Sequence, residues 1–306
     1  MDRLDLLALL TRIAETGSLS AAARALGLSQ PTASRQLRAL EDRLGAELVR
    51  RSTHDLSLTD AGLRALAEAR TMTAQWEALG EAVRGDGGRL SGPLTMLAPA
   101  GLGQTVLADI AARFLKEHPG VTMDWRIDDR PRDLSAEGID LWIRIGPVQD
   151  EGLVVRPLAL IERIVVAAPG TLAATPEALA GHPAVVLSPY ASAELTLTGP
   201  RGTQMTVQLR VAARTEQIFA ADRLVRSGVG LGLLPRWLVA EALASGALVE
   251  LCPGWRGPEI ALSLAWMPSR HRPARARRFA EHLQAAPELA ALNTTELLTD
   301  RPTSAS

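Results

Sequence analysis

The sequence predicts a chain of two parts, an all-α N-terminal part and an α/β C-terminal part. Residues 1–88 read as helices, apart from one short possible hairpin, and they contain a single proline, Pro31. A glycine-rich run at residues 85–93 then breaks the chain and marks a linker. Beyond it, short apolar strands alternate with amphipathic helices, a pattern typical of βαβ units and a mostly parallel sheet.

Length and composition exclude several classes of protein. The 306 residues, 47% hydrophobic and 22% charged, suffice for two or three domains and exclude a wholly disordered chain. The net charge of -1 excludes a basic coat over the whole surface but allows a local basic face. The single cysteine, Cys252, excludes an internal disulfide and a zinc site built from cysteines. No apolar run reaches the ~18 residues of a membrane span, and the N-terminus lacks the features of a signal peptide, so we expect a cytoplasmic protein with no membrane partner.

Two helices joined by a tight turn are expected at residues 20–26 and 30–44, an arrangement known as a helix-turn-helix. Ser20 is the expected N-cap of the first helix, and Gly27 takes the left-handed conformation that ends it. Ser29 is the expected N-cap of the second helix, whose first turn tolerates a proline because the N–H there needs no partner.

The second helix presents two different faces. Ala33, Leu37, Leu40 and Leu44 fall on one arc and form the expected core stripe. A separate arc carries residues that suit the major groove of DNA, where Gln bonds adenine, Arg bonds guanine and Ser holds phosphate. A polar stripe that merely faces solvent is the alternative for this helix.

A small wing is expected beside the second helix, at residues 48–58, where Arg50 and Arg51 precede a return of the chain. Six arginines and three acidic residues lie between Arg24 and Arg51, a local positive excess in a chain that is otherwise neutral. Such cations position a protein on the duplex through phosphate contacts. The residues that we assign to DNA contact are Ser29, Gln30, Pro31, Thr32, Ser34, Arg35, Arg38, Arg50 and Arg51.

A long helix follows the wing, with Thr59 as its expected N-cap. Leu66, Met72, Trp76 and Leu79 give it an apolar side that is too large for a lone exposed helix. We expect this side to be buried against a second chain, in a homodimer or a homotetramer. A dimer would place two recognition helices at half-sites about one DNA turn apart.

The α/β part is read from its apolar periodicity. The expected helices lie at residues 104–117, 217–227, 236–243 and 273–284, and the last one carries a cluster of arginines that either touches DNA or faces solvent: Arg270, Arg272, Arg275, Arg277 and Arg278. Trp125, Trp142 and Cys252 are expected to be packing residues. The expected strands lie at residues 94–97, 122–127, 140–145, 158–168 (with Arg163 inside it), 184–187, 208–212, 230–234, 248–251 and 260–266.

The sequence offers no catalytic constellation. The five histidines are scattered, without a His-x-x-x-His pair, and no Gly-x-Ser-x-Gly elbow is present. The glycine runs at residues 101–103 and 228–232 fail the dinucleotide-binding fingerprint on spacing. We therefore expect no enzymatic activity, no metal and no cofactor.

Several runs of the sequence resemble the family of LysR-type transcriptional regulators. In the N-terminal part these runs are residues 17–23, 28–37, 40–45 and 58–62. In the second half, residues 134–145 resemble an Asp-bearing strand of the family and residues 227–235 resemble its Gly-rich strand. The resemblance covers roughly residues 2–285. Val49 departs from the usual aromatic residue of the family, and His54 and Asp55 depart from its usual basic wing tip.

The resemblance implies the domain organisation. It implies a winged helix-turn-helix over residues 1–58, a linker helix for dimerisation over 59–88, and a two-lobed effector domain like type 2 periplasmic binding proteins. Lobe I would comprise residues 89–161 and 266–290, lobe II residues 162–265, and residues 291–306 a flexible tail. A small molecule would bind in the cleft between the lobes.

Candidate effector-binding residues come from both lobes. The loop at residues 99–101 offers backbone N–H groups at a helix start, where anions are attracted. Arg144, at the end of an apolar strand, needs either a structural carboxylate such as Asp140 or Asp128, or an anionic ligand. If the resemblance holds, Ser188, Tyr190 and Thr215 face the cleft from lobe II. The full set is Pro99, Ala100, Gly101, Gln104, Asp128, Arg144, Ser188, Tyr190 and Thr215.

These observations predict a ligand-responsive regulator that binds double-stranded promoter DNA and a small effector, such as an organic or aromatic acid. The alternative is a small-molecule-binding protein whose N-terminal helices serve only oligomerisation. The polar face of the second helix, with Arg50 and Arg51 beside it, discriminates between the two, because a dimerising helix does not need such a face.

Overall fold

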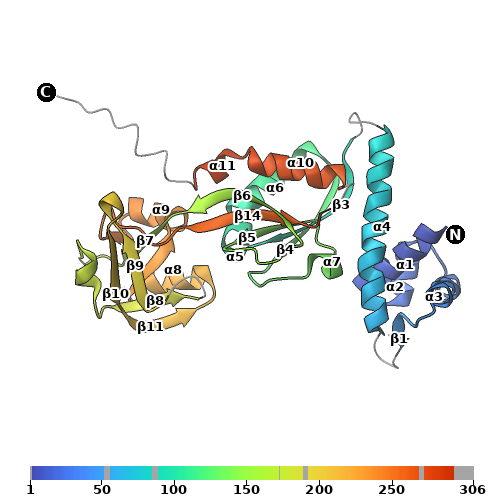
Figure 1. Cartoon of the computed structure of the whole chain (residues 1–306), viewed down its shortest axis with the longest axis horizontal. Coiled ribbons are helices and arrows are strands. Elements are labelled where there is room, and N and C mark those ends of the chain that lie inside the picture. The colour runs from blue at the N-terminus through green and yellow to red at the C-terminus, as the bar shows by residue number, and fades with distance from the viewer. Residues whose placement is uncertain are drawn as a thin grey trace.

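The computed structural model describes residues 2–51, 56–84, 89–171, 173–188, 192–268 and 272–292. Most of the tail expected to be flexible lies outside these ranges. The molecule is elongated, with the N-terminal helices at one end and two α/β lobes extending away from them (Figure 1). No helix of the described ranges is long and apolar enough to cross a membrane.

The N-terminal domain packs three helices, α1 (Arg3–Thr16), α2 (Leu19–Ala25) and α3 (Gln30–Leu44), beside a hairpin of β1 (Val49–Arg51) and β2 (Leu56–Leu58). Its core is built from Leu9, Leu10, Ile13, Leu37 and Leu48, which are almost fully buried. This arrangement is a helix-turn-helix followed by a wing.

The helix boundaries confirm most of the predicted caps. The hydroxyl of Ser29 accepts a hydrogen bond from the backbone N–H of Thr32 at 3.3 Å, and Gly27 has φ +66°. The expected cap of α2 is wrong, because Ser18 and not Ser20 accepts the backbone N–H of Ala21. The helix begins earlier than predicted since Leu19 is drawn into the core.

The stripe predicted for α3 is also one residue too long. Ala33, Leu37 and Leu40 are buried, but Leu44 is 52% exposed at the end of the helix. The last turn of α3 therefore extends past the core on which the rest of the stripe packs.

The long helix α4 (Asp60–Arg84) lies along α1, and the hydroxyl of Thr59 caps it by accepting the N–H of Gly62 at 2.9 Å. Leu66 is 4% exposed in the single chain. Its assignment to a dimer seam is therefore wrong, because its own chain already covers it.

Lobe I contains a five-stranded sheet in the order β4-β3-β5-β14-β6. Its strands are β3 (Ser91–Ala98), β4 (Gly120–Ile127), β5 (Leu141–Ile145), β6 (Val154–Ile161) and β14 (Ile260–Trp266). Its helices are α5 (Ala100–Gly103), α6 (Val106–Glu117), α7 (Leu134–Glu137), α10 (Ala274–Gln284) and α11 (Pro287–Ala290). The core lies between α6, α10 and the sheet, where the rings of Phe114 and Phe279 are 4.9 Å apart.

Lobe II contains a second five-stranded sheet, in the order β11-β8-β12-β7-β13, and a separate hairpin of β9 (Glu194–Thr198) and β10 (Gln204–Gln208). The sheet strands are β7 (Arg163–Ala167), β8 (Pro183–Leu187), β11 (Arg210–Thr215), β12 (Leu231–Pro235) and β13 (Val249–Leu251). The helices are α8 (Ile218–Arg226) and α9 (Arg236–Ala244), with short turns of 3₁₀ helix η1 (Pro176–Leu179) and η2 (Pro200–Gly202).

Three sequence-based expectations about the sheets are wrong. Each sheet is mixed and not mostly parallel, because β14 and β6 in lobe I, and β7 and β13 in lobe II, run antiparallel to their neighbours. The strand expected at residues 158–168 is two strands, β6 and β7, which belong to different sheets and separate at Glu162. The end of the expected linker, residues 91–93, begins β3.

Candidate nucleic-acid interface and effector cleft

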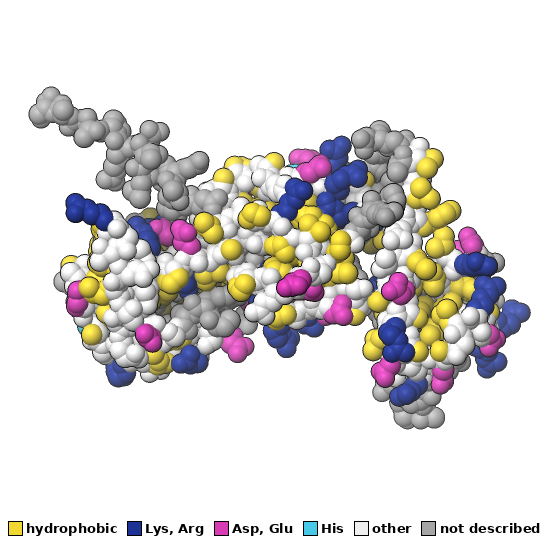
Figure 2. All heavy atoms as spheres, in the orientation of Figure 1, with side chains coloured by type: hydrophobic (Ala, Val, Ile, Leu, Met, Phe, Trp, Pro, Cys, Tyr) yellow, Lys and Arg dark blue, Asp and Glu magenta, His cyan; other side chains and the backbone are white. Residues whose placement is uncertain are grey.

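The polar face of α3 is presented to solvent. Gln30, Pro31, Arg35 and Arg38 are exposed, and Ser34 is half-buried. Figure 2 shows positively charged side chains grouped over the outer end of the N-terminal domain, where α3 lies. Ser29 and Thr32, also predicted to contact DNA, hold each other at the start of the helix, with their hydroxyl oxygens 2.8 Å apart.

The wing is held to α3 by a partly buried carboxylate. An Oε1 atom of Glu41 on α3 accepts the backbone N–H groups of Leu48 and Val49, at 2.9 and 3.3 Å. Arg50 follows directly and is exposed on β1. The strand β1 includes Arg51, but its side chain lies outside the described residues, as do His54 and Asp55 at the wing tip. Glu41 therefore fixes the angle between the wing and the recognition helix, although it is one of the acids in the basic segment.

One side of α4 is apolar and uncovered. Met72, Trp76, Leu79 and Val83 are between 47% and 80% exposed, and we call these four residues the α4 stripe. Three of them belong to the predicted dimer seam.

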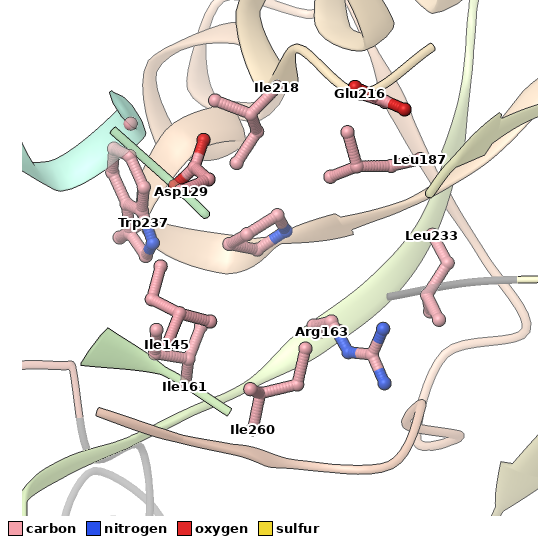
Figure 3. Close-up of a pocket in the computed structure, with 12 residues that line it drawn as sticks. Asp129, Ile145, Ile161, Arg163, Leu187, Glu216, Ile218, Leu233, Trp237 and Ile260 are labelled. Carbon is pink, nitrogen blue, oxygen red and sulfur yellow. The ribbon is translucent and has the colours of Figure 1, made fainter. Parts of the chain in front are cut away.

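A narrow cleft lies between the two lobes (Figure 3). Its lining is mostly apolar, with three charged side chains, Asp129, Arg163 and Glu216. The remaining lining residues are Gly101, Ile145 and Ile161 from lobe I, Leu187, Ile218, Leu233, Pro235 and Trp237 from lobe II, and Ile260 at the start of β14.

Arg163 is the buried cation of this cleft. It is 5% exposed, and its Nε and Nη2 atoms donate to the carbonyl oxygen of Pro258 at 2.9 and 2.6 Å. Burial lowers the pKa of Arg163 to about 10. The signal for this residue was visible in the sequence as a charge inside an apolar strand, but the predicted site did not include it.

The start of α5 closes one end of the cleft. A Cβ atom at Gly101 would lie 3.0 Å from Cγ2 of Ile218 and 3.5 Å from the Trp237 ring, so a larger side chain would displace Ile218 where lobe I meets lobe II. The backbone N–H of Ala100 donates to Oδ1 of Asp129 at 3.1 Å. Of the predicted segment at residues 99–101, Gly101 lines the cleft.

The other predicted residues of lobe I lie elsewhere. The Gln104 amide turns back to the carbonyl of Ala100, at 2.9 Å. Asp128 is bound by Arg130 and Arg132, whose hydrogen bonds hold the pKa of this carboxyl well below its usual range. The neighbouring Asp129 faces the cleft in its place.

Arg144 has a different partner from those predicted. Its guanidinium donates to the backbone carbonyl of Asp129 and lies 5.5 Å from the ring centroid of Trp142. A carboxylate oxygen of Asp140 accepts the backbone N–H of Thr95, at 2.8 Å. The expected pairing of Arg144 with Asp140 or Asp128 is therefore wrong, and Arg144 instead steadies the loop that carries Asp129.

In lobe II, Ser188 and Thr215 are used for local structure. The Ser188 hydroxyl accepts from Arg214 at 3.4 Å, and the Thr215 hydroxyl accepts the backbone N–H of Gln217 at 3.1 Å. Glu216, next to Thr215, lines the cleft. Tyr190 lies outside the described residues.

The remaining residues singled out by sequence are mainly structural. Arg272 lies 4.4 Å over the ring of Trp266, and Arg275 is buried and donates to the carbonyl of Pro93, so the prediction of one solvated arginine face is wrong for these two. Trp142 and Cys252 are buried, as expected for packing residues. Within the described residues, no group of three or more His, Cys, Asp or Glu side chains is placed to hold a metal ion.

A recognition helix with a wing, a long connecting helix and two α/β lobes around a cleft define a class of protein, the ligand-responsive transcriptional regulators. Residues 4–63 match the family model of the bacterial regulatory helix-turn-helix protein, lysR family. Residues 87–288 match the LysR substrate binding domain. The chain belongs to the LysR family of transcriptional regulators.

Curated relatives agree with this assignment. The HTH-type transcriptional regulator PtxR of Pseudomonas aeruginosa is 36% identical over 277 residues, which cover 89% of each chain. The HTH-type transcriptional activator AaeR of Escherichia coli is 30% identical over 263 residues, or 84% of each chain.

Solved structures share the fold. A full-length variant of OxyR from Pseudomonas aeruginosa matches with a TM-score of 0.70 at 20% identity, covering 97% of this chain and 99% of its own. CrgA, a LysR-type transcriptional regulator from Neisseria meningitidis, matches with a TM-score of 0.57 at 24% identity, covering 93% of this chain and 98% of its own.

Proposed function

We propose that this regulator reads promoter DNA through the exposed face of α3, with Arg50 of the wing on the phosphate backbone. The observation that carries the proposal is the placement of Gln30, Arg35 and Arg38 on one solvent-facing side of a helix that is held rigidly against the wing. Side chains of this kind bond the edges of adenine and guanine in the major groove. Acting on promoter DNA, the protein would work in the bacterial cytoplasm.

The test begins with sequencing of the genomic fragments that the full chain retains. Fluorescence anisotropy on a retained site then compares wild type with Gln30→Ala and Arg35→Ala, and we expect each change to weaken specific binding by about 1–3 kcal/mol. Arg50→Ala should weaken binding to all sequences alike and flatten its salt dependence. Arg277→Ala, an exposed arginine on α10, is the matched control and should bind as wild type does. Unchanged binding by both α3 variants would refute the proposed interface.

We further propose that the cleft binds the effector, and that an organic or aromatic acid is its class. The apolar lining suits a ring or a branched chain, and Arg163 supplies a cation for a carboxylate. Melting curves with a panel of aromatic and aliphatic acids, followed by promoter binding with each compound that raises Tm, test this step. Gly101→Val should abolish the response and preserve DNA binding, because the new side chain meets Ile218 across the cleft.

The domain assignments follow from these two proposals. Residues 1–58 would bind DNA, residues 59–88 would join two chains through the α4 stripe, and lobe I (89–161 and 266–290) and lobe II (162–265) would enclose the effector. A protein whose N-terminal helices only oligomerise is the second candidate, and retention of no genomic fragment by a dimeric chain would favour it.

A further inference from the structure

Trp237 has a hydrogen-bond donor that the protein leaves unused. It is the second residue of α9, and its side chain lines the cleft between the lobes. Its Nε1 atom is buried and has no hydrogen-bond partner in the part of the chain that the structure describes. A buried N–H group without an acceptor is unfavourable, so most such groups in native proteins find a partner.

The surroundings of the indole explain why the protein does not supply an acceptor. In Figure 3 the nitrogen of Trp237 points toward the side chains of Ile145 and Ile161, which are hydrocarbon. The adjoining edge of the six-membered ring faces Gly101, whose Cβ position would be 3.5 Å from Cζ2 and Cη2. The donor is therefore directed along the apolar wall of the cleft.

We propose that the effector carries an uncharged oxygen, a hydroxyl or a carbonyl, which accepts the hydrogen bond of Trp237 Nε1. This inference rests on the proposed function, that the cleft binds an effector at all. The oxygen is uncharged because the carboxylates of Asp129 and Glu216 line the same cleft and repel a second anion, whereas Arg163 is the cation that a carboxylate of the ligand would meet. Trp237 thus selects an apolar molecule that is oxygenated at one position beyond any acid group.

A matched control packs against the same hydrophobic core. Trp125 on β4 is half-buried and contacts the same core as Trp237. Its Nε1 atom, however, donates to the carbonyl oxygen of Gly103 at 3.0 Å, and it does not line the cleft. Trp125→Phe removes an N–H group that makes a hydrogen bond within the protein. Trp237→Phe removes an N–H group that makes none.

Calorimetric titration of the full chain with benzoate, phenylpropionate and the ring-hydroxylated forms of each tests the proposal. In wild type we expect at least one hydroxylated acid to bind about fivefold to tenfold more tightly than its parent, the ratio that one net hydrogen bond supplies. Trp237→Phe should remove this preference while the affinity for the parent acid changes much less. Trp125→Phe should retain the preference.

A second measurement needs no ligand. Trp125→Phe removes a hydrogen bond that the free protein makes, and Trp237→Phe removes a donor that it does not use, so Trp125→Phe should lower Tm by more. A larger loss in Trp237→Phe, or a hydroxyl preference that survives this substitution, would overturn the inference.

The titration also separates this inference from the proposed function. If the acids bind and alter promoter binding but the hydroxyl preference does not depend on Trp237, only the role of Trp237 is wrong. If no acid binds, both the acid-binding cleft and the role of Trp237 are refuted.

Discussion

Arg163 is a cation that the fold accepts inside the protein. Its guanidinium is bonded to the carbonyl of Pro258, on a segment that returns from lobe II to lobe I. Arginine remains charged even when burial lowers its pKa, so a buried guanidinium needs hydrogen bonds such as these. Arg163 therefore lines the cleft and also holds the returning segment in place.

Arg163→Met should destabilise the protein by about 1–3 kcal/mol, because the two hydrogen bonds from the buried guanidinium to the Pro258 carbonyl are lost. Thermal or urea unfolding measures the change. Arg223→Met, on the exposed side of α8, is the control and should stay within about 0.5 kcal/mol of wild type. Equal stability of both variants would show that the guanidinium is not holding the segment.

Cys252 should be inert as a thiol in the folded protein. It is fully buried, and this burial, with a smaller contribution from Glu177, raises its pKa to about 11. A thiol whose pKa is higher in the folded state stabilises the fold below the pKa of the unfolded chain, near 9, and this contribution disappears as pH rises through about 11.

At pH 8 a thiol reagent should therefore label Cys252 only after denaturation, and the free energy of unfolding should fall between pH 9 and 11. The variant Cys252→Ser should lose the part of this fall that belongs to the thiol. Rapid labelling of the native protein would contradict the burial.

At the scale of single residues, the sequence predicted features that depend on neighbours within one helical turn. It did not predict features that depend on residues far apart in the chain. The caps at Ser29 and Thr59 follow from residues within one turn, and both are confirmed. The choice between Asp128 and Asp129 depends on which neighbour faces the cleft, and periodicity does not determine this in a loop. The sequence also named Arg144 on β5 as a cleft residue and left out Trp237 on α9, because the facing of one lobe toward the other is a long-range feature.

At the scale of elements, β6 and β7 show why an apolar run is ambiguous. The apolar run continues from β6, an edge strand of the lobe I sheet, into β7, which is buried throughout in the lobe II sheet, so only Glu162 marks the change of sheet. The hairpin of β9 and β10 was missed altogether, whereas the limits of β14 were predicted correctly. Sequence patterns located most elements but did not reveal which sheet each strand joins.

The α4 stripe leads to a prediction about assembly. If the α4 stripe joins two chains as proposed, Trp76→Glu together with Leu79→Glu should yield a monomer that keeps its melting behaviour, since both side chains are exposed in the single chain. Sedimentation velocity measures the change. Leu66→Glu, on the buried side of the same helix, should instead unfold the N-terminal domain. A double variant that remains a full dimer would place the dimer contact elsewhere.

A second element-scale prediction concerns the contact of α4 with α7. Arg70 Nη1 donates to the carbonyl oxygen of Ala136 at 2.5 Å. The rest of the Arg70 side chain packs over Gly138, which has φ +65°. Arg70→Ala should expose the amides of residues 134–138 to faster hydrogen exchange, with those of α2 and α3 unchanged. Unchanged exchange in α7 would show that the contact does not order it. Arg64→Ala, an exposed arginine on the same helix, is the control.

For the whole molecule, the two crossings between the lobes act together. Glu162 at the first crossing accepts from Arg236 at 2.6 Å and from Arg256, which belongs to the second crossing. Glu250 accepts from the same two arginines at 3.0 and 3.1 Å, and the backbone N–H of Gly257 donates to the carbonyl of Arg163 at 2.9 Å. The crossings thus form one bonded unit, which favours motion of the lobes about a single hinge.

The contact of Gly101 with Ile218 affects the rate at which a small molecule enters the cleft, as well as the shape of the cleft. Because the lobes approach each other at that end of the cleft, we predict that a molecule from solution enters the interior when the hinge opens. Association should then be slower than diffusion allows, and in stopped-flow mixing the observed rate should level off as the concentration of the small molecule rises. Ile218→Ala should raise the plateau by removing the side chain that meets Gly101, and a rate that climbs linearly without limit in wild type would contradict this account. Such a regulator would respond when the concentration of its effector stays high and would not respond to a brief rise.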